Sequence, residues 1–217
     1  LLDFTGLPRF HHIPPAHVAP AIDTLLEEAE AAVEQARNVS PVTWDTFVTP
    51  LEDATEKLGR AWGQVSHLQS VMNSPQIREA YNAALPKVTR FFSALGQDQA
   101  LYAQYRSLAQ SPEFNGYDQA RRKAVENALR DFRLGGAELA DDKRARFTHV
   151  QQELASLSAK FSENLLDATD AFALYVEDEA ELAGLPADVL ASCRAAAEED
   201  GRQGWTLPLH MPCHLPV

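Results

Sequence analysis

The chain has 217 residues, of which 45% are hydrophobic and 23% charged, so it can bury a core in one or two domains. Its formal net charge of −12 disfavours binding to nucleic acids and to anionic membrane surfaces, since both attract proteins through Lys and Arg. No apolar run approaches the roughly 18 to 20 residues of a membrane-spanning helix, and we expect no membrane partner.

The predicted elements, taken in chain order, are almost all helices. Apolar residues recur every three or four positions across most of the chain, which is the period of an amphipathic helix. A short helical segment is expected at 44–48, before the second long helix. The long helical stretches are predicted at residues 16–37, 49–72, 75–109, 118–134, 141–178 and 187–200.

Several residues mark where these helices begin and end. Thr49 and Glu52 form a capping-box pattern, with Pro50 at the first helical position, where its missing N–H costs nothing. Ser74 is expected to cap the next helix. Within 75–109, Pro86 predicts a kink and Gly96 a break.

The helix at 141–178 carries the clearest apolar stripe. At 1.5 Å per residue it would be roughly 50 Å long, and Gly184 and Pro186 are expected to end it. We expect its aromatic stripe to be core and not a ligand site. The stripe consists of Phe147, Val150, Leu154, Leu157, Phe161, Leu165, Ala168 and Phe172.

The pattern changes after residue 200. Trp205, Leu207, Leu209 and Met211 alternate with other residues, which predicts one strand, and Pro208 would restrict it to a sheet edge. A lone strand leaves its backbone groups unpaired, so either it has an unexpected partner or the protein continues. The predicted fold class is all-α: long antiparallel helical hairpins forming a bundle, with one short β-strand at the C-terminus. The predicted domains are a helical domain at 1–200 and the start of a following, truncated region at 201–217.

The histidines near the N-terminus do not form a recognisable metal site. None of the seven histidines in the chain is followed by Glu, so the His-Glu-x-x-His pattern of helical zinc proteases is missing. His11, His12 and His17 have no helical spacing between them and are interpreted as loop or helix-entry residues. His67 lies near an apolar stripe and is interpreted as a structural histidine.

His210, Cys213 and His214 resemble a ligand set more closely, because two imidazoles and a thiol fall within five residues. Zinc usually needs a fourth ligand, and none is visible, so a metal site is the weaker interpretation. The two cysteines, Cys193 and Cys213, are too few for a disulfide framework and are expected to be free thiols. The predicted sets of catalytic, cofactor-binding and metal-binding residues are therefore all empty.

Several stretches resemble the thimet-oligopeptidase-like zinc metallopeptidases in their exact residues as well as in their helical pattern. They lie in family order along nearly the whole chain. The stretches are LLDFTGLPRF (1–10), HVAPA (17–21), HLQSVMNSPQIREAYN (67–82), NALRDFRLGGAEL (127–139) and FSENLLDAT (161–169). The sequence departs from the family pattern at His11, Pro14, Pro208, Cys213 and His214.

The resemblance implies a considerably longer, zinc-dependent oligopeptidase that cuts short peptides in the cytoplasm. Its His-Glu-x-x-His helix lies in a later part, while the N-terminal helices form one wall of a channel that admits short peptides. We therefore expect Zn only in the full-length enzyme and an inactive segment here. The expected partners are short peptide substrates and the missing C-terminal catalytic half. The alternative is a freestanding helical protein-interaction module without enzymatic activity.

Overall fold

The structure is a computed structural model that describes residues 1–214, apart from the side chains of Pro212 and His214. The backbone divides into two compact units, Leu1–Leu157 and Ser158–Val217. None of the helices in the described part of the chain combines the length and apolarity needed to cross a membrane. The predicted domain division after residue 200 stays a prediction.

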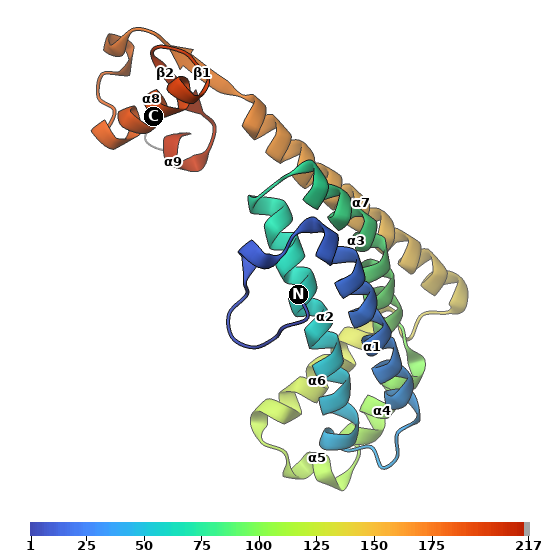
Figure 1. Ribbon diagram of the computed structural model, residues 1–217. Coiled ribbons are helices and arrows are strands. Elements are labelled where there is room, and N and C mark those ends of the chain that lie inside the picture. The colour runs from blue at the N-terminus through green and yellow to red at the C-terminus, as the bar shows by residue number, and fades with distance from the viewer. Residues whose placement is uncertain (215–217) are drawn as a thin grey trace. The chain divides into compact units, whose positions relative to one another are not determined.

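The first unit is built from helices (Figure 1). α1, α2 and α3 are the long ones, and α1 packs against both of the others. Most of the predicted helices are confirmed, and the break expected at Gly96 separates α3 from α4. The elements are η1 (Phe10–His12), η2 (Pro15–His17), α1 (Val18–Asn38), η3 (Trp44–Val48), α2 (Thr49–Val71), α3 (Pro75–Gly96), α4 (Gln99–Ala109), α5 (Pro112–Gly116), α6 (Gln119–Gly135) and the start of α7 (Asp141–Ala171).

The start of α2 corrects one prediction. The capping box belongs to Thr43 and Thr46, not to Thr49 and Glu52: the Thr43 side chain accepts from the Thr46 amide, and the Thr46 side chain accepts from the Thr43 amide. The reason is that η3 runs directly into α2. Thr49 therefore has helical backbone angles and no free turn to cap.

Short polar residues cap most of the later helices in this unit. The side chains of Ser74, Asp98, Ser111 and Asp118 each accept a hydrogen bond from an amide in the first turn of α3, α4, α5 and α6. Gly136 ends α6 in the left-handed conformation, with φ of 98°. Of these N-terminal caps only Ser74 was predicted from the sequence, and the short helix α5 was not predicted at all.

The core of the first unit lies along α1. Its fully buried face consists of Val18, Ile22, Leu25 and Ala29, and each large apolar side chain contributes about 1.5–3 kcal/mol when fully buried. Aromatic pairs tie other elements to this core. The ring centroids of Phe47 and Tyr105 are 4.7 Å apart, those of Trp62 and Tyr81 4.8 Å.

α7 does not behave as predicted. None of its 31 residues is buried. The expectation that its stripe is core is therefore wrong for this chain: Leu154, Leu157, Phe161 and Leu165 are between 52% and 69% exposed. The period identified an apolar face, but these four side chains of it are more than half exposed.

The second unit contains a small two-stranded sheet. β1 (Ala173–Val176) pairs antiparallel with β2 (Trp205–Pro208), with Val176 opposite Trp205 and Ala173 opposite Pro208. The C-terminal strand is thus confirmed, although it ends at Pro208 and does not reach Met211.

The partner of this strand was missed, because the helix predicted to continue to residue 178 ends at Ala171. The segment 173–176 contains Tyr and Val, which favour strands, and pairing with β2 overrides the helical period. The sheet packs with η4 (Glu179–Leu182), α8 (Ala187–Glu199) and α9 (Met211–His214) around a core of Val176, Leu182, Val189, Cys193, Trp205, Leu207 and Cys213.

Candidate binding pocket between helices α1 and α3

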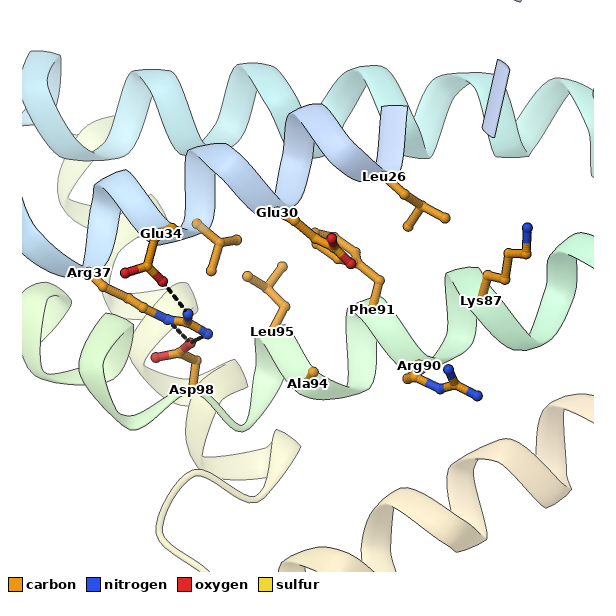
Figure 2. A pocket seen from close by; sticks show the side chains of 11 residues that line it. Leu26, Glu30, Glu34, Arg37, Lys87, Arg90, Phe91, Ala94, Leu95 and Asp98 are labelled. Atoms are coloured by element: carbon orange, nitrogen blue, oxygen red, sulfur yellow. Dashed lines mark hydrogen bonds and ion pairs between the residues drawn. The ribbon is translucent and has the colours of Figure 1, made fainter. Parts of the chain in front are cut away.

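A pocket of about 680 Å³ lies in the first unit between α1 and α3 (Figure 2). The last lining residue, Asp98, belongs to the turn between α3 and α4. The volume is within the range of sites that bind small molecules. The pocket is lined by Leu26, Glu30, Val33, Glu34, Arg37, Lys87, Arg90, Phe91, Ala94, Leu95 and Asp98.

Helical spacing explains how both walls form. On α1 the lining residues recur about once per helical turn, as Leu26, Glu30, the adjacent pair Val33 and Glu34, and Arg37, so they share one face. On α3 they also recur once per turn, as Lys87 followed by the adjacent pairs 90–91 and 94–95. The pocket therefore lies between one face of α1 and one face of α3, two helices that contact each other.

The floor of the pocket is apolar. Leu26, Val33 and Phe91 are buried, and Leu95 is half-buried. In Figure 2 the Phe91 ring lies between the two helices, behind the carboxylate of Glu30. An apolar side chain of a ligand could pack against this floor, and the charged lining residues would surround it.

One end of the pocket is closed by a charge cluster around Arg37. Its Nη1 atom is 2.7 Å from Glu34, while Nε and Nη2 are 2.7 and 2.6 Å from the same oxygen, Oδ2, of Asp98. The hydrogen bond with Asp98, followed by that with Glu34, raises the pKa of Arg37. Asp98 also accepts from the Leu101 amide at 2.9 Å and so caps α4. The charged groups at this end of the pocket are therefore already paired with one another.

The other charged lining residues have fewer partners. Lys87 is paired, with its Nζ atom 2.6 Å from Asp23 Oδ1. Glu30 on α1 and Arg90 on α3 form no side-chain hydrogen bond or ion pair within the described part of the chain. A free carboxylate and a free guanidinium thus border an apolar floor. This arrangement can hold a ligand that has an amino group, a carboxylate and an apolar group between them.

The structure places the N-terminal histidines outside this pocket. His11 and His12 lie in η1, with ring centroids 6.0 Å apart, and His17 ends η2. The ring of His67 is 5.1 Å from that of Phe10, which fits a packing role. Among the described residues no group of three or more His, Cys, Asp and Glu side chains could hold a metal ion.

The C-terminal candidates His210 and Cys213 contact different residues. His210 Nε2 is 3.6 Å from Asp170 Oδ1, whereas Cys213 Sγ is 3.4 Å from Cys193 Sγ. The side chain of His214 lies outside the described residues. That this chain holds no catalytic, cofactor or metal residue stays a prediction.

Sequence reasoning did not find the pocket residues. Glu30 and Arg90 are ordinary exposed helix residues in the sequence, 60 positions apart. Only the pairing of α1 with α3 brings them to one site. The available signal was the charged residues on each helix face, mainly acidic on α1 and basic on α3, and charged faces are typical of any solvated helix.

Comparison with known proteins gives a consistent family. The sequence model for the neurolysin/thimet oligopeptidase N-terminal domain matches residues 22–144, which include the whole pocket. Oligopeptidase A of Haemophilus influenzae is 41% identical over 217 residues, which is 100% of this chain and 32% of that protein. Escherichia coli oligopeptidase A is 41% identical over 97% of this chain and 31% of its own length.

The match to a plant protein covers similar shares of the two chains. The probable cytosolic oligopeptidase A of Arabidopsis thaliana is 35% identical over 100% of this chain and 32% of its own length. The chain thus spans about a third of the length of the relatives that it matches.

Proposed function

The chain belongs to the neurolysin/thimet oligopeptidase family, and on that premise we propose that it is the N-terminal helical part of a zinc-dependent oligopeptidase that hydrolyses short peptides in the cytoplasm. The observation that carries the proposal is 40–41% identity over essentially the whole chain to oligopeptidase A of three bacteria. Because the match covers about a third of each relative, the peptidase chemistry is assigned to the remaining two thirds.

Zinc is implied by the family, but the described residues do not fit a zinc site. They contain no group of three potential ligands, whereas catalytic zinc needs three protein ligands and an open position. We therefore derive no catalytic step from this chain. Its proposed role is to shape the channel through which a peptide reaches the catalytic part.

The α1–α3 pocket is the surface of this chain that we propose meets a peptide. Its free Glu30 carboxylate can pair with a peptide ammonium, and the free Arg90 guanidinium with a carboxylate. Phe91 supplies apolar surface between them. Such exposed pairs contribute about 0.2–1 kcal/mol each, so the pocket would orient a peptide weakly and leave the reaction to other groups.

The contact with the rest of the enzyme is proposed to involve α7. Its stripe of four exposed Leu and Phe residues is the kind of apolar surface that marks an interaction site. Because the helix has no buried residue within this chain, the remaining two thirds of the protein would supply its packing partners.

A domain-exchange experiment tests the assignment. The corresponding third of the Haemophilus influenzae oligopeptidase A is replaced by this chain, and cleavage of a fluorogenic peptide is measured before and after removal of zinc by a chelator. We expect the hybrid to be active and zinc-dependent, and the 217-residue chain alone to be inactive. A folded hybrid without activity would contradict the proposal and favour a freestanding interaction module. Cleavage by the isolated chain would contradict it too.

The role of the pocket is tested in the same hybrid. Glu30→Gln and Arg90→Gln should each raise KM about twofold to fivefold, with kcat unchanged, because they remove weak ground-state binding. Glu27→Gln is the matched control, since it removes the same charge from an exposed position of α1 outside the pocket. If the Glu30 and Arg90 variants match the control, the pocket does not contact the peptide.

A further inference from the structure

The only two cysteines of the sequence meet in the core of the second unit. Cys193 lies on α8 and Cys213 on α9, and their Sγ atoms are 3.4 Å apart. Their residues are 2% and 9% exposed. They are 20 positions apart in the sequence, so the contact is made by the fold and not by sequence proximity.

The surroundings leave the thiols facing each other. Their neighbours in this small core are apolar: Val176, Leu182, Val189, Trp205 and Leu207. Two thiols can pack as small apolar groups, but two that touch can also be joined by a rotation of their side chains if an oxidant accepts the electrons. The proximity of the sulfur atoms therefore has a chemical consequence beyond packing.

We propose that Cys193 and Cys213 form a reversible dithiol–disulfide site that low-molecular-weight disulfides of the oxidised-glutathione type oxidise. The thiolate of one cysteine attacks the oxidant, forms a mixed disulfide and releases one glutathione thiolate. The second cysteine then displaces the other glutathione and closes the protein disulfide. In total two thiols lose two electrons and two protons, and one oxidised glutathione becomes two reduced molecules.

The structure also assigns an order to the two attacks. Cys213 is the more exposed residue and lies on a helix of four residues, so a small oxidant reaches it first. Cys193 is on a helix of 13 residues and is almost fully buried. Burial, followed by its hydrogen bond with Cys213, raises the pKa of Cys193 to about 11, so at neutral pH it is mostly a thiol and is the poorer attacker of a free oxidant. Once the mixed disulfide has formed on Cys213, the small thiolate fraction of Cys193 attacks it as an intramolecular neighbour, and its proton goes to solvent.

Closure would join α9 covalently to α8 across β2. The closed loop contains the strand that holds the sheet together, so oxidation would stabilise the second unit by restricting its unfolded state. In a reducing compartment the pair stays a dithiol, and the disulfide forms only when the glutathione pool becomes oxidised. The site would therefore couple the stability of this unit to the redox state.

The test is an equilibration of the 217-residue chain in glutathione buffers of increasing oxidised fraction, followed by acid quenching and intact-mass analysis. We expect an intramolecular disulfide, seen as the loss of two hydrogen atoms. The effective molarity of the two thiols, which measures how strongly the chain favours the intramolecular disulfide over glutathione adducts, should be at least about tenfold higher in native buffer than in urea. The reason is that the fold holds the sulfur atoms together. Peptide mapping of the native sample identifies the bond even if variants fold poorly.

Two variants separate the two roles. Cys193→Ser should accumulate the mixed disulfide on Cys213. Cys213→Ser should react with oxidised glutathione at least about tenfold more slowly than Cys193→Ser does. Equal effective molarity in native buffer and in urea would overturn the proposal. So would stable glutathione adducts on both cysteines of the native chain without a protein disulfide.

Discussion

Asp98 performs two structural tasks at one end of the pocket, and its replacement gives a sharp prediction. Its Oδ1 atom accepts from the Leu101 amide at 2.9 Å, which caps α4. Its Oδ2 atom accepts from Arg37 at 2.6 and 2.7 Å. The Asp98 side chain is only 7% exposed, whereas that of Arg37 is 42% exposed. An alanine would remove both interactions and an asparagine only the second.

The magnitudes follow from these two contacts. Loss of a helix cap costs about 1 kcal/mol. A hydrogen bond to a charged group contributes about 1.5–3 kcal/mol, but Arg37 is partly solvated and keeps its contact with Glu34, so about 1 kcal/mol is the appropriate figure. We expect Asp98→Ala to lower the free energy of unfolding by about 2 kcal/mol and Asp98→Asn by about 1 kcal/mol, since Asn caps helices as well as Asp does.

The assay is urea unfolding followed by tryptophan fluorescence. Trp205 lies in the second unit and Trp44 and Trp62 in the first. A Trp205→Phe background therefore makes the signal report on the unit that contains Asp98. Arg37→Met should cost about as much as Asp98→Asn. Equal losses for the Asn and Ala variants would refute the assignment of the cap, and losses below about 0.5 kcal/mol for both would refute the reasoning as a whole.

Three further predictions concern the rest of the chain. Phe47→Ala should lower the free energy of unfolding by about 3–5 kcal/mol in the same assay, because Phe47 is fully buried, whereas the exposed Phe92→Ala should cost far less. Burial raises the pKa of Tyr117 to about 12. The pKa of Tyr in the unfolded chain is about 10, so the stabilisation that this group gives the folded state is complete below pH 10 and is lost as the pH rises towards 12. Tyr117→Phe should reduce that loss of stability in unfolding curves measured from pH 8 to 11. The exposed apolar stripe of α7 should make the isolated chain self-associate; Phe161→Asp should weaken this association in sedimentation experiments, and Ser158→Asp, which adds the same charge on α7, should not.

The fold was predictable where local signals decide it. Helical periods, Ser74 as a cap and Gly96 as a break each act within one turn, so the sequence reveals them directly. The β1 strand was not predictable in this way. Residues 173–176 follow a strong helical stripe, and their strand conformation depends on pairing with residues 205–208, about 30 positions later. A local pattern carries no information about such a partner.

The candidate site was not predictable for a related reason. The pocket depends on which face of α3 lies opposite which face of α1, and single-helix patterns leave that pairing open. Cys193 and Cys213 illustrate the same limit, because each looks like an isolated free thiol in the sequence. Their 3.4 Å contact depends on β2 and α9 turning back onto α8.

The exposed stripe on α7 links the energetics of this chain to its proposed place in a longer enzyme. In folded proteins most helical stability comes from packing of an apolar face, and α7 has no buried residue here. Burial of one large apolar side chain contributes about 1.5–3 kcal/mol, so four of them could contribute about 6–12 kcal/mol in gross terms. That is enough to hold another part of a protein after ordering costs are subtracted. The family relatives are about three times as long as the matched region, and under the proposed function the rest of such a chain would bury this stripe.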